Sequence, residues 1–319
     1  MGERREAYPL LSLHFLCRVL ALGLALGGIP GPPLAGQEGT AGAGEIREGA
    51  PPPAAKPGET PAPVWLGPDG QPLPFTSEEE VLEFLRTAKV VSMEEVGEGI
   101  TRPKKVVLEK DGIRMHAIFR DVNEDKAVVR LASGKTEKGF RDSYLFECAA
   151  YELSRLLGLD HVPPVVERSV RNRSGSLQVW IEKAVTEQKR REKNMNPPDR
   201  GRWSRQVYAQ RFFDQLIFNT DRNLGNTLID SNWKMWFVDH TRAFRSSPDL
   251  RDPATLQVCE RNLWERLRAL DEGVVKQQLS EFLRPAEIKA LLERREKIRQ
   301  HFQQLIEQQG EENVLYTEE

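Results

Sequence analysis

The stretch FNTDRNLGNTLIDSNWKMWFVDHTRAF, residues 218–244, carries three polar residues whose spacing points to one kind of chemistry. Asp221 precedes Asn226 by five residues, and Asp239 follows thirteen residues later at the end of an apolar run. Phosphoryl transfer needs a carboxylate that orients the attacking hydroxyl, and oxygen ligands for the divalent metal on the phosphates. We therefore expect Asp221 to face the acceptor, and Asn226 and Asp239 to bind Mg²⁺ or Mn²⁺. The alternative interpretation is a polar turn with a helix-capping Asp.

Two strands joined by a tight turn are predicted upstream, in KKVVLEKDGIRMHAIFR, residues 104–120. An Asp-Gly pair between alternating apolar residues is typical of a two-residue hairpin. With Asp111 and Gly112 in the turn, Lys110 faces Ile113, and successive side chains point to opposite faces. One face is predicted to carry Val106, Leu108, Met115, Ala117 and Phe119. The other is predicted to carry Lys105, Val107, His116, Ile118 and Arg120.

A helix followed by strands is predicted in DSYLFECAAYELSRLLGLDHVPPVVERSV, residues 142–170. Its apolar face is Ala149, Leu153, Leu156 and Leu157, and Gly158 ends it. Strand-like pieces follow at 165–170 and 177–182, and helices from about residue 204. This order predicts an α+β, two-lobed, protein-kinase-like fold. Its small β-rich lobe would contain one key helix, and its large lobe would be mostly helical.

Three segments resemble known atypical kinases. LIFNTDRNLGN is similar to the catalytic loop of type II phosphatidylinositol kinases and HipA-type protein kinases. FECAAYELSRLLGLDHVPPV resembles the corresponding helix and strand of the secreted Golgi casein kinase family, and FVDHTRAF resembles that family's metal-binding segment. The resemblance covers about residues 97–245. It implies an atypical kinase fold that uses ATP and a divalent metal.

The resemblance also implies residue roles. Asp221 takes the place of the catalytic acid, and Asn226 and Asp239 take the places of the metal ligands. Glu147 stands where those kinases keep the helix Glu that pairs with a strand lysine, but this chain has Arg120 at the lysine position. Two departures from the family pattern therefore matter: Arg120, and His240 and Thr241 in place of the glycine that follows the metal-binding Asp.

The predicted nucleotide site combines both lines of argument. Arg keeps the positive charge of Lys and can hold phosphate, although its planar fork is not equivalent to an ammonium. We expect Arg120 to pair with Glu147, and Lys105 either to join them or to point to solvent. The residues predicted to contact the nucleotide are Arg120, Lys105, Glu147, Ile118 and Glu182.

The ends of the chain show a different composition. A basic start, a short apolar run at residues 19–28 and small residues after it predict a signal peptide or N-terminal anchor over residues 1–36. Residues 37–75 are rich in Pro, Gly and Ala and are predicted to be a disordered linker. The small lobe is expected over 76–183, the large lobe over 184–309, and a flexible tail over 310–319.

Composition narrows the possible functions. The formal net charge of −2 gives no indication of nucleic-acid binding. Three cysteines are too few for a disulfide scaffold or a zinc site, and buried free thiols are favoured over a pair for Cys148 and Cys259. We expect an ATP- and metal-dependent phosphotransferase acting on a hydroxyl of a protein, sugar or lipid outside the cytoplasm. The alternatives are a nucleotide-binding pseudokinase and a non-catalytic extracytoplasmic binding protein.

Overall fold

The computed structural model describes residues 64–96, 102–130 and 136–317, which belong to one compact unit, Ala55–Glu319. The predicted signal peptide or anchor and residues 37–63 of the predicted linker lie outside the described residues. Within the described ranges, every helix is too short or too polar to span a lipid bilayer.

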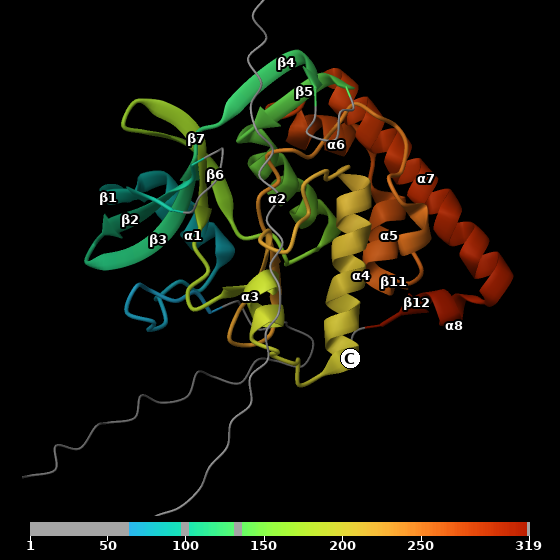
Figure 1. Cartoon of the computed structure of the whole chain (residues 1–319), viewed down its shortest axis with the longest axis horizontal. Coiled ribbons are helices and arrows are strands. Elements are labelled where there is room, and N and C mark those ends of the chain that lie inside the picture. The colour runs from blue at the N-terminus through green and yellow to red at the C-terminus, as the bar shows by residue number, and fades with distance from the viewer. Residues whose placement is uncertain (1–63, 97–101, 131–135, 318–319) are drawn as a thin grey trace, which may run out of the picture. The chain divides into compact units, whose positions relative to one another are not determined.

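The small lobe is built on a five-stranded antiparallel sheet in the order β1-β2-β3-β7-β6 (Figure 1). Its strands are β1 (Lys89–Glu95), β2 (Lys104–Lys110), β3 (Ile113–Arg120), β6 (Val165–Val170) and β7 (Arg173–Val179). The predicted hairpin register is confirmed, since Lys110 pairs with Ile113 and Val106 with Ala117. The predicted apolar face is fully buried, which fixes this register because a one-residue slip would expose all of it.

Two helices accompany this sheet. Helix α1 (Glu78–Thr87) packs against β6, β2 and β7, and the Ser77 hydroxyl caps it by accepting from the Glu80 N–H. Helix α2 (Leu145–Leu157) packs against β6 and β7 and ends at Gly158, which has the left-handed conformation expected of a C-terminal glycine. Glu147 lies in the first turn of α2. The sequence therefore places this residue correctly on the helix.

Two features of the small lobe differ from the sequence-based expectation. Strands β4 (Asn123–Arg130) and β5 (Thr136–Ser143) form a separate two-stranded sheet between β3 and α2. Every described side chain of β4 except Val129 is exposed, so β4 lacks the apolar alternation that reveals a half-buried strand. The second difference is the turn between β6 and β7. Only residues 171 and 172 form it, both with positive φ, so β7 begins at Arg173 and ends before the predicted residue 182.

The large lobe is mostly helical, as predicted, and α7 crosses it as the longest helix (Figure 1). Its helices are α3 (Glu187–Glu192), α4 (Arg200–Leu216), the 3-10 helix η1 (Pro253–Thr255), α5 (Arg261–Ala269), α6 (Glu272–Leu279), α7 (Pro285–Gln309) and α8 (Glu311–Val314). Its short strands are β8 (Val185–Thr186), β9 (Thr227–Ile229), β10 (Met235–Phe237), β11 (Cys259–Glu260) and β12 (Leu315–Tyr316). The catalytic-loop stretch of the sequence therefore runs from the end of α4 through β9 and β10.

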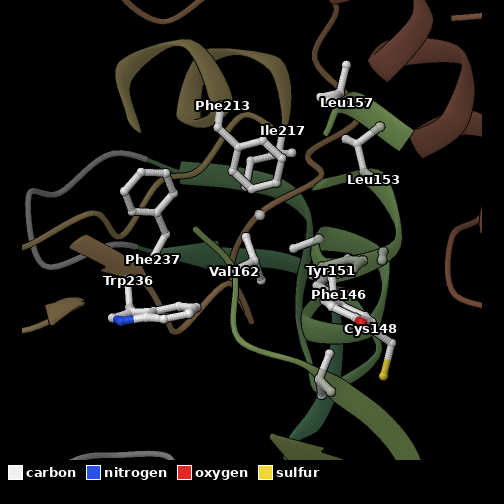
Figure 2. Close-up of a cluster of buried hydrophobic side chains, with 14 of the residues drawn as sticks. Phe146, Cys148, Tyr151, Leu153, Leu157, Val162, Phe213, Ile217, Trp236 and Phe237 are labelled. Carbon is white, nitrogen blue, oxygen red and sulfur yellow. The ribbon is translucent and has the colours of Figure 1, made fainter. Parts of the chain in front are cut away.

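A shared core joins the two lobes behind this stretch. Side chains of α2, of the end of α4 and of β10 converge around Val162 (Figure 2). Phe213 and Phe237 are fully buried there, and Cys148 is a buried free thiol, as is Cys259. Because close-packed interiors deform little, this core fixes α2 relative to the loop that carries Asp221 and Asp239.

Both predicted ends of the folded region need correction. Residues 64–75, expected to be linker, belong to the fold, because Trp65 is buried with its ring centroid 5.5 Å from that of Trp236. The predicted flexible tail also contains structure, since β12 pairs in parallel with β11 and Val314 is fully buried. In both places one or two apolar side chains in a polar or Pro-rich context bury enough surface to order the segment.

Candidate active site

A cleft of about 510 Å³ lies where the small-lobe sheet meets the catalytic loop. Its lining includes Ile118 and Arg120 from β3, residues Gln178–Ile181 at the end of β7 and just after it, and Asn226 and Asp239. Four of the predicted site residues therefore share one cavity. A larger hollow of about 630 Å³, along α6 and α7, is lined by Lys, Glu and aliphatic side chains and holds none of the predicted site residues.

The predicted contact between Arg120 and Glu147 is present. Arg120 Nε lies 3.4 Å from Glu147 Oε1, and both side chains are buried. Glu147 Oε2 also lies 3.1 Å from Nδ1 of His240. Burial opposes ionisation of Glu147, but the Arg120 charge and the His240 hydrogen bonds outweigh it and hold its pKa at about 2. Glu147 is therefore a permanent anion behind the cleft.

Asp221 adjoins the cleft, and its carboxylate is accessible to solvent. Its backbone N–H donates to Asn219 Oδ1, and Asn223 Nδ2 donates to its Oδ1 at 3.3 Å. Its Oδ2 lies 3.6 Å from Nη1 of Arg242, and the side chain is 37% exposed. A carboxylate held in this way can accept a hydrogen bond from an incoming hydroxyl group.

Asn226 and Asp239 have the donor atoms of a divalent metal site. Asn226 Nδ2 donates to the Asp221 carbonyl at 2.8 Å, which leaves its Oδ1 free of that contact. Burial raises the pKa of Asp239. The Arg120 charge lowers this pKa, whereas the nearby carboxylates of Glu147 and Asp221 raise it further. Carboxylate and amide oxygens suit Mg²⁺ or Mn²⁺. An acid that is crowded by two other acids is a natural position for such a cation.

The protein alone does not complete this metal site. Within the described ranges, no group of three or more His, Cys, Asp or Glu side chains is arranged to hold a metal ion. Mg²⁺ in kinase sites binds one or two carboxylates together with substrate phosphates and water. Asn226 and Asp239 fit that incomplete arrangement.

Two residues predicted to contact nucleotide lie elsewhere. Lys105 does not join the Arg120–Glu147 pair and does not point to solvent; it is half-buried, with Nζ 4.5 Å from the ring centroid of Trp180. Glu182 Oε1 lies 2.5 Å from Nδ1 of His116, a residue of β3, so the Glu182 carboxylate already has a partner on the sheet. Ile118 lines the cleft as expected, and Trp180 lines it as well. Lys105 thus contacts Trp180, a residue that lines the cleft, from the position opposite Ile118 on the sheet.

The structure adds two arginines that sequence reasoning did not assign. Arg222 donates to both carboxylate oxygens of Asp214 and to the carbonyls of Asn226 and Val238. Arg242 Nε donates to Asp142 Oδ2 at 2.7 Å, which positions it beside Asp221. Arg222 lies in DRNLGN and Arg242 lies in DHTRAF, next to the expected catalytic and metal-binding residues. This closeness in sequence is the signal from which both arginines could have been predicted.

Unsatisfied polar atoms around Arg120 fit a phosphate-bearing ligand. Arg120 Nη1 is a buried donor without a hydrogen-bond partner, and Arg120 Nε faces Glu147 Oε1 at 3.4 Å without a hydrogen bond of regular geometry. Buried donors without partners are costly, and an arginine fork matches phosphate oxygens. The residues present therefore fit a nucleotide whose phosphates reach Arg120 and whose metal reaches Asp239.

Solved structures with this architecture were found. The structure of hydra Fam20 with sugar is 16% identical over 75% of this chain and 92% of that chain, with a TM-score of 0.54. The Golgi casein kinase is 16% identical over 75% of this chain and 78% of that chain, with a TM-score of 0.51. The fold is that of the Fam20-like atypical kinases. The Golgi casein kinase with Mn and ADP bound has the same TM-score, 0.51, and 17% identity.

The Fam20-like fold confirms the predicted two-lobed α+β architecture. No family model matches the chain, and no curated protein matches it. At 16–17% identity, the likeness establishes the fold and not the reaction.

Proposed function

We propose that the chain is an ATP- and metal-dependent phosphotransferase acting on a hydroxyl group of a protein, sugar or lipid. One observation carries the proposal: a single cleft is lined by Arg120, backed by Glu147, together with Asn226 and Asp239, and Asp221 adjoins it through the hydrogen bond from Asn226 Nδ2 to the Asp221 carbonyl. These are the cation, metal-ligand and acid positions that phosphoryl transfer requires. The Mn/ADP complex of a structural neighbour supports the same ligand pair.

Each residue has a defined part in this proposal. Asp221 accepts a hydrogen bond from the acceptor hydroxyl and takes its proton as the hydroxyl oxygen bonds to the γ-phosphorus of ATP and the bond from that phosphorus to the departing ADP breaks. Arg120 holds nucleotide phosphate, and Glu147 keeps the arginine in place. Asn226 and Asp239 hold the divalent metal, which when bound neutralises phosphate charge. Arg242, 3.6 Å from Asp221, keeps that carboxylate in place.

A nucleotide-binding pseudokinase is the second candidate. The observation that favours it is Arg120 at the position where the resembled kinases keep lysine. Arg presents a planar fork and not a compact ammonium, and the exchange is often harmful at phosphate sites. Against it, Asn226, Asp239 and Asp221 are all present in geometry suited to catalysis.

An experiment on the purified full chain separates the candidates. ADP formation and autophosphorylation are measured with ATP and Mn²⁺ for the wild type and for Asp221→Asn. The phosphotransferase predicts turnover that Asp221→Asn loses. A pseudokinase predicts nucleotide binding without turnover in either protein. A non-catalytic binding protein predicts no nucleotide binding.

We further propose that the protein acts outside the cytoplasm. The support is the signal-like composition of residues 1–36, together with the fold shared with a Golgi kinase. Processing or membrane retention of an epitope-tagged chain tests this. A tagged chain that remains intact in the cytoplasm would contradict the proposed location and would leave the proposed phosphotransferase function unaffected.

A further inference from the structure

A line of buried polar contacts runs from the small-lobe sheet to helix α4 and passes through the Glu147 carboxylate. Arg120 contacts Glu147, Glu147 contacts His240, His240 contacts Arg222, and Arg222 contacts Asp214 on α4. Glu147 and His240 are both fully buried. His240 is the central member, and it stands where the resembled family has glycine.

We propose that His240 is a positioning residue that ties α2 to the catalytic and metal-binding loops, so that the nucleotide site is assembled before any ligand binds. The effect of this link on catalysis rests on the proposed function. The connection itself is a property of the nucleotide-free protein and can be measured there.

The hydrogen-bond partners determine how His240 is protonated. Arg222 Nη2 lies 3.1 Å from His240 Nε2, and a guanidinium can only donate. His240 Nε2 must therefore accept, so the ring proton sits on Nδ1 and donates to Glu147 Oε2 at 3.1 Å. The ring thus presents one donor and one acceptor, and each is used. Arg120 pairs with the Glu147 carboxylate at one end of the line and Arg222 pairs with the Asp214 carboxylate at the other, so each of these two carboxylates has a cation beside it.

The same arginine holds the segments that carry both proposed metal ligands. Arg222 Nη1 donates to the carbonyl of Asn226 and to that of Val238, the residue before Asp239. Asp239 has φ of 59°, in the left-handed region that is costly for residues other than glycine. A side-chain anchor at the next residue stabilises such a backbone. His240 therefore links the position of Glu147 to the positions of Asn226 and Asp239.

Three substitutions dissect this link. His240→Asn places an amide donor near Nδ1 and keeps the Glu147 contact while it loses the Arg222 contact. His240→Gln can reach the Nε2 position and accept from Arg222. His240→Gly restores the family residue and loses both contacts. A matched control is His301→Asn, because the ring of His301 also has a hydrogen-bond partner, with Nε2 2.8 Å from the Leu256 carbonyl, and lies on α7, outside this line.

The readout is amide hydrogen exchange of α2 and of residues 221–240 in the nucleotide-free full chain. His240→Gly is expected to speed α2 exchange by about tenfold, a typical size for coupling between packed elements. His240→Asn should protect α2 better than His240→Gly does and should loosen the 221–240 region. His301→Asn should leave α2 unchanged. Unchanged α2 exchange in all three His240 variants would overturn the proposal, as would equal loosening of α2 by the His301 control.

A second readout separates this inference from the proposed function. Affinity for ADP with Mn²⁺ should weaken by about tenfold in His240→Gly and less in His240→Asn. If the wild type binds no nucleotide, the proposed function fails, and the exchange data still decide the role of His240. If the wild type binds nucleotide and His240→Gly binds it equally well, the assembly proposal fails and the proposed function stands.

Discussion

Arg120 Nε lies 3.4 Å from Glu147 Oε1, and the two side chains meet in the interior with 6% and 0% of their surfaces exposed. An arginine therefore occupies the place of the strand lysine and makes the contact expected of it. His240 shares the same carboxylate, so Glu147 has two partners.

Replacement of Arg120 should affect both stability and nucleotide use. Arg120→Ala leaves Glu147 with one partner, and the loss of one member of a buried pair costs about 3 kcal/mol of unfolding free energy. The Michaelis constant for ATP should rise as well. Arg120→Lys should be tolerated or improve activity, because it restores the family residue. Denaturant unfolding and ATP kinetics check this, and an Arg120→Ala protein with wild-type stability would contradict the importance of the pair.

The depressed pKa of Glu147 predicts a specific pH dependence of stability. Its pKa is about 2 in the folded protein against a reference of 4.5. A lowered pKa stabilises the fold above pH 4.5, and that contribution, about 3 kcal/mol, is lost as the pH falls toward 2. The difference in unfolding free energy between wild type and Glu147→Gln should be constant from pH 7 to 5 and should shrink below pH 4.5. A difference that is independent of pH down to 3 would contradict the assignment.

Asp221→Asn should separate transfer from binding. The Asp221 carboxylate is 37% exposed and is proposed to meet the acceptor hydroxyl, so its loss should lower kcat by about 10²–10⁴-fold. Nucleotide affinity should stay within about twofold of wild type, because Arg120 and Asp239 remain. Steady-state kinetics and a nucleotide titration check this together. Retention of full turnover would remove Asp221 from the mechanism.

The C-terminal segment should contribute to stability and not to catalysis. Truncation after Gln309 removes β12 and the buried side chains of Val314 and Leu315, which are 0% and 6% exposed. We expect a loss of about 3 kcal/mol of unfolding free energy and an unchanged Michaelis constant for ATP. Truncation after Thr317 is the matched control. A chain ending at Gln309 that is as stable as this control would show that the tail is dispensable.

The sequence predicted those parts of the fold whose signals are local. The Asp-Gly turn and the alternating apolar residues determined the β2–β3 register, and Gly158 marked the end of α2. The β4–β5 hairpin was missed because the side chains of β4 are almost all exposed and carry no alternating apolar signal. The buried Trp65 was missed because a single aromatic residue in a Pro-rich stretch finds its partner, Trp236, only after folding.

The candidate site shows the same division. Spacing and resemblance predicted the Arg120–Glu147 contact, and they singled out Arg120, Asn226 and Asp239, which line one cleft; the roles of these residues and of Asp221 stay predictions. They did not give the contact of Lys105 with Trp180, because strand alternation defines a face and not the neighbour that a long side chain meets. Nor did they reveal the connection through His240 and Arg222, which depends on the approach of two loops in space.

The most direct test of the central proposal is a nucleotide titration of the purified full chain with Mn²⁺ and, separately, with a chelator. The proposed roles of Asn226 and Asp239 predict at least tenfold tighter ADP binding with the metal. Asp239→Ala should fold and should bind ADP with one weak affinity under both conditions. Equal ADP affinity for the wild type with Mn²⁺ and with chelator, or no binding in either, would contradict a metal-dependent nucleotide site in this cleft.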